Sequence, residues 1–221
     1  MVATISADIV RSSTLTTDDL IALRGRLLDL FGKFEADYPG FWARIVRGDS
    51  IECFVPEYRY SLRIALLIKL CVKMQVSRFD CSDLLKRYGI RFAIGLAGID
   101  CADKEADVLN GPAIWLSGRG LDEISRKGTV YSALELEHAF ESVNGLLDSY
   151  VVMLSDLVDT YSVKQAEVVF YKLMGLKEVE IAERLGIFQS AVNARSTSAR
   201  WSLLGRAVKD FEAFDFEGIC G

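Results

Sequence analysis

In the first 134 positions, stretches in which apolar residues recur every two positions, as in strands, alternate with stretches in which they recur every three or four, as in helices. The predicted strands cover 2–10, a hairpin at 42–56 with a two-residue turn at Gly48-Asp49, 90–99 and 128–134. The predicted helices follow a Thr16 N-cap, cover 58–77 and begin at Pro112. This order predicts an α+β fold, in which a split βαβ arrangement places helices on one face of a mainly antiparallel sheet.

Two of the helical segments, 58–77 and 135–160, have apolar patterns that indicate what they pack against. The helix at 58–77 is apolar on more than one face, which predicts that it is sandwiched between other elements. The segment 135–160 has no strand signal, and a stripe from Leu146 to Val158 predicts a connecting helix. That stripe packs either on the sheet domain or against a second copy of the chain, and we favour the second arrangement. We therefore expect a sheet domain over 1–135, a connecting helix over 136–160 and a helical domain over 161–221.

The helical domain shows the spacing of two short helices around a tight turn. Ser162 and Gln165 form a capping-box start, and Gly175 ends the first helix of this domain. The positions Ala182, Gly186 and Val192 are those of a helix-turn-helix: a small residue where helices touch, a glycine in the turn and a branched residue that locks the second helix. In that second helix, Val192, Ala199 and Leu203 are predicted to face inward.

Composition narrows the function classes. The 221 residues are 51% hydrophobic and carry a net charge of −5, so a wholly basic nucleic-acid coat is excluded, although a local basic surface is not. Five scattered cysteines form no metal-ligand spacing and predict reduced thiols in a cytoplasmic protein. No segment is long and apolar enough to predict a membrane span. The acidic, aromatic tail from Asp210 onward docks either on the chain itself or on a partner.

Four blocks of the predicted sheet domain carry a resemblance to a known family. They are "SADIVRSST", "RGDSIECF", "IRFAIGLAGI" and "NGPAIWLSGRGLDEIS". In this order they resemble the catalytic domain of class III nucleotide cyclases, and more closely the SatD-like bacterial proteins that share this palm-type domain. The resemblance implies a ferredoxin-like sheet domain.

In that family pattern, two acids lie side by side, and the matching positions here are Asp8 and Asp49. Adjacent carboxylates repel unless a cation lies between them, and Mg²⁺ suits carboxylates and nucleotide phosphates. The resemblance therefore implies Mg²⁺ as a cofactor, held by Asp8, the backbone carbonyl of Ile9 and Asp49. Gly48 and Arg119 would contact nucleotide phosphates. The alternatives are that Gly48-Asp49 is only a good turn, that Asp8 only caps a loop and that Arg119 is an exposed helix residue.

Two positions depart from the cyclase pattern. Trp115 replaces a transition-state asparagine, and Ile45 replaces the residue that recognises the base. No catalytic residue is therefore assigned. A retained acid pair without these side chains indicates a nucleotide sensor or a degenerate domain, with a Mg²⁺-dependent nucleotidyl cyclase or nucleotidyltransferase using Asp8 and Asp49 as the alternative.

The last third of the chain resembles the DNA-binding regions of bacterial sigma factors and LuxR-type regulators over "KQAEVVFYKLMGLKEVEIAERLGIFQSAVNARSTSARW". The outer face of its second short helix would contact DNA, because Gln and Asn suit adenine and Arg suits guanine. The predicted DNA-contacting residues are Gln189, Ser190, Asn193, Thr197 and Arg200. The alternative is a helical packing module that never meets DNA.

These patterns together predict a DNA-binding transcriptional regulator whose cyclase-like domain serves as sensor or dimerisation domain. Its partners would be double-stranded DNA and a nucleotide effector, and a single helix-turn-helix predicts a homodimer that contacts two half-sites.

Overall fold

The computed structural model describes residues 1–46, 48–127, 132–136, 141–216 and 218. Five strands form one mixed sheet in the order β2-β3-β1-β4-β7, with β7 parallel to β4 and the other neighbours antiparallel. These strands are β1 (Val2–Ile9), β2 (Trp42–Val46), β3 (Ser50–Val55), β4 (Ile90–Ala97) and β7 (Ser132–Leu136), while β5 (Cys101–Asp103) and β6 (Val108–Asn110) pair separately.

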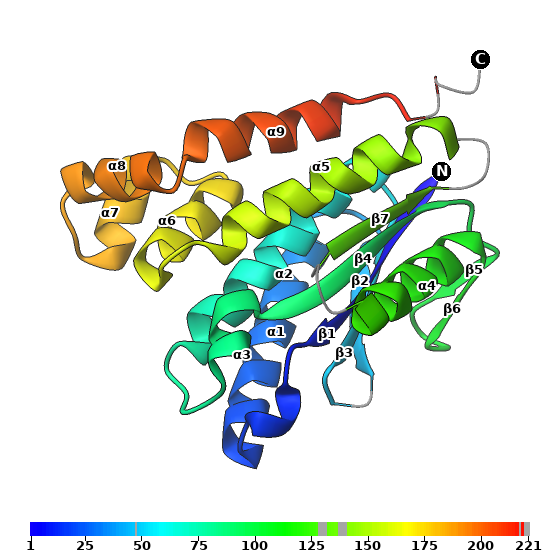
Figure 1. Cartoon of the computed structure of the whole chain (residues 1–221), viewed down its shortest axis with the longest axis horizontal. Helices are drawn as coiled ribbons and strands as arrows, with labels where there is room; N and C mark the ends of the chain where they lie inside the picture. Colours follow the sequence, from blue (N-terminus) through cyan, green and yellow to red (C-terminus); the bar gives the residue numbers. More distant parts are fainter. Residues whose placement is uncertain (47, 128–131, 137–140, 217, 219–221) are drawn as a thin grey trace.

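The predicted α+β class and the predicted order of the sheet elements are confirmed (Figure 1). Helix α3 and the β5–β6 hairpin were not predicted, and the described part of the predicted strand at 128–134 belongs to β7. The α-helices are α1 (Thr17–Asp37), α2 (Ser61–Val76), α3 (Asp83–Tyr88), α4 (Pro112–Lys127), α5 (Glu141–Asp159), α6 (Val163–Leu173), α7 (Glu178–Leu185), α8 (Gln189–Ser198) and α9 (Trp201–Ala213).

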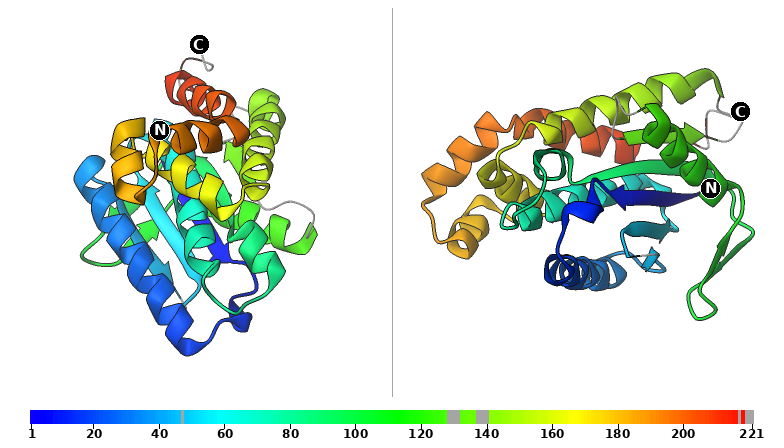
Figure 2. Two further views of the ribbon diagram at one scale, coloured as in Figure 1. Left: turned by 90° about the vertical axis from the view of Figure 1, so that its left-hand side faces the viewer. Right: turned by 60° about the horizontal axis from the view of Figure 1, so that its bottom comes forward.

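Helices cover both faces of the sheet, so the prediction that they share one face is wrong (Figures 1 and 2). Alternate residues of β1 point to opposite sides, as the strand period requires. Ile5 lies in the main hydrophobic core with residues of α1 and α2, whereas the hydroxyl groups of Thr4 and Ser6 lie 2.9 Å and 2.8 Å from the Ser117 hydroxyl of α4. A Cβ at Gly95 of β4 would lie 2.2 Å from the carbonyl oxygen of Ala113, so this glycine permits α4 to lie directly on the sheet.

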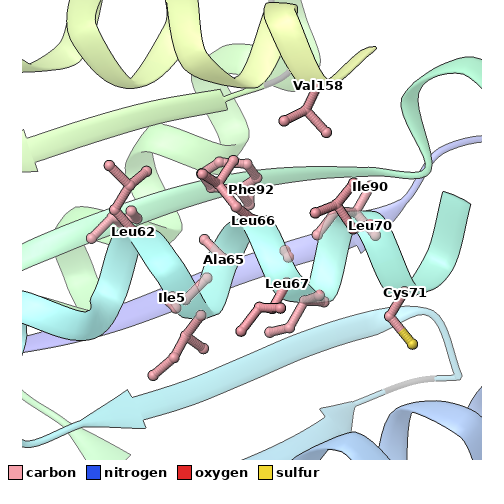
Figure 3. Packing of buried hydrophobic residues seen from close by; sticks show 14 of the residues in the cluster. Ile5, Leu62, Ala65, Leu66, Leu67, Leu70, Cys71, Ile90, Phe92 and Val158 are labelled. Carbon is pink, nitrogen blue, oxygen red and sulfur yellow. The ribbon is translucent and has the colours of Figure 1, made fainter. Parts of the chain in front are cut away.

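Helix α2 is the centre of the hydrophobic core, which confirms the prediction that it is sandwiched. Figure 3 shows its side chains between Ile5 and Phe92 of the sheet and Val158 of α5. Helices α6 and α9 also pack on α2. The same hydrophobic cluster runs from Ala3 to Phe216, so the sheet and the C-terminal helices share one core.

Two lysines lie inside this core because α2 has no exposed face there. Lys69 is fully buried, its Nζ lies 2.8 Å from Oδ1 of Asp159, and it donates to the carbonyl oxygens of Tyr88 and Ile90. Lys73 donates to the carbonyl oxygens of Arg87 and Asp159. Burial raises the pKa of Asp159 to about 6 and lowers that of Lys73 to about 8, and it also lowers the pKa of Lys69. The end of α5 is thus fixed to α2 by charge.

Helix α5 packs on the chain itself, which corrects the favoured prediction that its stripe pairs with a second copy. Val151, Leu154 and Val158 are buried in the core, and the Tyr150 hydroxyl donates to the carbonyl oxygen of Ala207 in α9. Leu146, which was predicted in the same stripe, is 74% exposed. The prediction that the segment 135–160 contains no strand was also wrong, because β7 extends to Leu136.

The domain limits stay predictions. The predicted boundary at 135/136 falls within β7, and the boundary at 160/161 falls between α5 and α6.

The β2–β3 hairpin differs from its prediction, and the C-terminal tail settles an alternative that the sequence left open. In the β2–β3 hairpin, Val46 pairs with Ser50, so the loop has three residues instead of two, with Gly48 at a φ of 89°. At the other end of the chain, Phe216 is fully buried and packs edge-on against Tyr58 at 5.5 Å, so this part of the tail docks on the chain itself. None of the described helices is long and apolar enough to span a bilayer.

The Asp159→Ala variant is expected to lose about 3–5 kcal/mol of unfolding free energy, because it leaves the buried amino group of Lys69 without its carboxylate partner. Urea denaturation at pH 7 measures this loss. The control is Asp210→Ala, which removes an exposed pair with Arg206 at 3.5 Å and should cost less than about 1 kcal/mol. Equal losses in the two variants would show that the buried pair has no special structural role.

Candidate functional site

The two acids of the predicted metal site lie on neighbouring strands at one end of the sheet. Asp8 is opposite Ser50 in the β1–β3 ladder, and the backbone N–H of Ile9 donates to the carbonyl oxygen of Asp49 at 3.1 Å. The structure therefore brings Asp8, Ile9 and Asp49 together, as antiparallel pairing of β1 with β3 requires. Gly48 precedes Asp49 in the hairpin loop.

Each acid already has a partner of its own. Arg91 of β4 donates from Nε to Oδ1 of Asp8 at 2.8 Å and from Nη2 to Oδ2 at 2.6 Å. The Ser12 hydroxyl donates to Oδ2 of Asp49 at 2.5 Å. Because a bidentate guanidinium neutralises Asp8 and uses both of its oxygens, these residues fit Mg²⁺ poorly. Among the described residues there is also no cluster of three or more His, Cys, Asp or Glu side chains that suits a metal.

Arg119 is not brought to the acid pair. It is exposed on α4, and its charge acts on Glu135 of β7, whose pKa is raised chiefly by burial. The next residue, Gly120, faces Ala93 and Glu135 of β4 and β7, while Asp49 lies in the loop between β2 and β3. Trp115 is also exposed, and its Nε1 donates to Asn110. Among the described residues, Arg119 makes no hydrogen bond or ion pair with Asp8 or Asp49, so the structure does not show the implied nucleotide contacts as one site.

Helices α7 and α8, here called the α7–α8 pair, flank the turn at Gly186 as predicted, but α8 ends at Ser198, before the predicted inward positions Ala199 and Leu203. Val192 is buried with Val168, Ile181 and Ala182 in a small apolar cluster. Gly186 ends α7 in the left-handed conformation, with φ 63° and ψ 37°, which a residue without a Cβ adopts most easily. The preceding helix α6 begins with the predicted capping box between Ser162 and Gln165. Local signals thus position the second helix of the pair against α6.

The outer side of α8 is fully exposed. All five predicted DNA-contacting residues have exposed side chains, and we call this set the polar edge of α8: Gln189, Ser190, Asn193, Thr197 and Arg200. Val192 and Ala199 face inward as predicted, but Leu203 is 54% exposed, so its inward placement was wrong. The reason is a break in the helix: Arg200 has a φ of 54°, and α9 begins after it in a new direction.

Only part of the positive charge near α8 is available to a ligand. Arg195 lies 3.7 Å from Glu167 of α6, and Arg206 lies 3.5 Å from Asp210 within α9. Arg200 is exposed and, within the described chain, makes no ion pair with a carboxylate. Of these three arginines, Arg200 is therefore the one best placed to contact a phosphate group or a base.

Comparisons with family models, curated proteins and solved structures found no match to this chain. The resemblance to cyclases and to bacterial regulators accordingly stays a prediction from the sequence.

Two residues of these sites were not predicted from the sequence. Arg91 pairs with Asp8 across β1 and β4, and only the strand register reveals that contact. Phe188, the N-cap residue of α8, is 86% exposed, more than any other large hydrophobic residue in the described chain. The signal available for Phe188 was its position directly before Gln189, where a polar N-cap residue is usual. The ring of Phe188 adds an apolar surface next to the polar edge of α8.

The Arg91→Ala variant is expected to lose about 1–3 kcal/mol of unfolding free energy, since Asp8 then keeps its charge without its bidentate partner. Arg119→Ala, which removes an exposed arginine, should change stability by less than about 0.5 kcal/mol. Urea denaturation of both variants checks this. If Arg91→Ala matches the wild type, the pair does not stabilise the sheet.

Proposed function

We propose that the chain is a DNA-binding transcriptional regulator in which the α7–α8 pair is a helix-turn-helix. The exposure of the whole polar edge of α8 supports this proposal best. The sheet, with its helices, would be a ferredoxin-like, degenerate cyclase-type domain that serves for sensing or dimerisation. Helix α6 has residues in the shared core, and Val168 of α6 packs with Val192 of α8, so this packing would hold α8 in a fixed orientation for a duplex.

The chemistry of the polar edge suits base recognition in the major groove. Gln189 and Asn193 present amides that pair with adenine, and Arg200 presents a guanidinium that pairs with guanine or a phosphate. Ser190 and Thr197 can donate to bases or phosphates. Gln189, Ser190, Asn193 and Thr197 recur at spacings that keep them on one side of α8, and Arg200 follows just after the helix ends at Ser198.

We also propose a homodimer, because a single short recognition helix covers only one half-site. Leu146 and Met153 support a contact between copies: they are seven residues apart on α5, and both are exposed apolar side chains. A contact through this side of α5 would leave the buried stripe of the helix undisturbed.

An enzymatic function has weaker support. A Mg²⁺-dependent nucleotidyl cyclase would need Asp8 free to bind metal, and Arg91 holds both of its oxygens. It would also need Arg119 at the acid pair, and among the described residues Arg119 makes no hydrogen bond or ion pair with either acid, while its charge acts on Glu135 of β7. The adjacency of Asp8 and Asp49 is explained by the sheet register without any catalytic role.

Asn193→Ala and Arg200→Ala are expected to weaken duplex binding in different ways. We would select binding sequences from a random duplex pool and measure affinity by fluorescence anisotropy at several salt concentrations. Arg200→Ala should weaken binding and, if Arg200 meets a phosphate, reduce the salt slope by about 1. Asn193→Ala should cost about 1–3 kcal/mol and relax specificity at one base pair.

Arg126→Ala, which removes an exposed arginine from α4, is the matched control and should bind like the wild type. Wild-type protein that shows no salt-dependent binding to any duplex would contradict the proposed function.

Phe188 provides a separate test of groove contact. Its exposed ring at the start of α8 is expected to touch thymine methyl groups, so uracil in place of thymine should weaken wild-type binding about fourfold per contacted methyl. Phe188→Ala should bind the thymine and uracil duplexes equally. If uracil weakens both proteins to the same extent, another residue contacts the methyl group.

A further inference from the structure

A cavity lies where helices α1 and α2 meet the helices that precede α8. Residues of α1, α2, α6 and α7 line this partly open cavity of about 400 Å³. Pockets that bind small organic ligands typically measure about 300–1,000 Å³, so the cavity has room for such a molecule. In the left view of Figure 2, α6 and α7 lie near one end of α1. The cavity therefore joins two parts of the chain that are far apart in sequence.

Three arginines from three helices line this cavity: Arg26 of α1, Arg78 just after α2 and Arg184 of α7. Arg26 is part-buried, whereas Arg78 and Arg184 are exposed; other part-buried arginines are paired with carboxylates, as in Arg63 with Glu212 and Arg91 with Asp8. Within the described residues, none of the three cavity arginines makes an ion pair with a carboxylate. This concentration of unpaired guanidinium groups occurs in a chain whose net charge is −5.

The remaining lining residues are mostly uncharged at neutral pH. Arg184 stacks over the Tyr171 ring at 5.0 Å, which orients its guanidinium beside the phenol. Gln75 adds an amide donor. The one lining carboxylate, Glu167, lies 3.7 Å from Arg195. Cys71 at the cavity wall is buried, and burial raises the pKa of its thiol to about 11, so it adds no negative charge at neutral pH.

We propose that this cavity binds a small phosphate-bearing organic molecule, with Arg26, Arg78 and Arg184 holding its phosphate groups. Guanidinium groups match phosphate geometry and pair with it bidentately. Arg184 is the penultimate residue of α7, two residues before the Gly186 turn into α8. A ligand held by all three arginines ties α7 to α1 and α2. The binding itself does not depend on the proposed function; only its effect on DNA affinity does.

Titration of the full chain with inorganic phosphate, pyrophosphate and ATP, without DNA or metal, tests the proposal. Isothermal titration calorimetry at constant ionic strength should show saturable binding of at least one of these anions. Arg78→Ala and Arg184→Ala should each weaken that binding at least tenfold. Both side chains are exposed enough for the variants to fold, and circular dichroism verifies it. Arg24→Ala removes an exposed arginine from α1 outside the cavity and should bind like the wild type.

The proposal is overturned if none of the three anions binds saturably, or if the Arg78 and Arg184 variants bind as tightly as the wild type. It is also overturned if these variants weaken only duplex binding, since the arginines then contact DNA phosphates. Binding of an anion by a chain that never binds DNA would support the cavity and reject the proposed regulator, so the two failures are distinguishable.

Discussion

A buried ion pair between Lys69 and Asp159 constrains the arrangement of the whole chain. Helix α2 has the sheet on one side and C-terminal helices on the other, so a lysine in its middle cannot reach water. Such a charge is tolerated only with partners at close range, and Asp159 together with two backbone carbonyls supplies them. The need to satisfy Lys69 therefore fixes where α5 ends and where the chain turns into α6.

A second polar contact holds helices α6 and α9 against the start of α2. Arg63, near the start of α2, donates to both carboxylate oxygens of Glu212 in α9 and to the carbonyl oxygen of Leu173 at the end of α6. With α6 and α9 anchored at these points, the α7–α8 pair extends beyond the main core and has its own small apolar cluster. The polar edge of α8 stays exposed because only Val192, Ser196 and Ala199 are needed for packing there.

Local features of the fold could be predicted from the sequence, and features that depend on distant partners could not. The end of α7 and the start of α8 follow from Gly186 and short apolar repeats that lie within a few residues of one another, and the start of α6 follows from its own capping box. The stripe on α5 identified a buried side but not what buries it, because periodicity carries no information about the partner. Leu203 was misplaced because the left-handed backbone at Arg200 ends a pattern that otherwise looks continuous. The Arg91–Asp8 pair depends on strand register, and the arginine cavity depends on three helices meeting, so no sequence spacing reveals either.

The break at Arg200 also limits how much of a duplex one chain can inspect. Helix α8 has ten residues and is therefore about 15 Å long, which corresponds to about four base pairs. So short a footprint recurs by chance many times in any genome. Discrimination would then come from the distance and orientation between two copies, and thus from how rigidly each body carries its helix, more than from any single contact with a base.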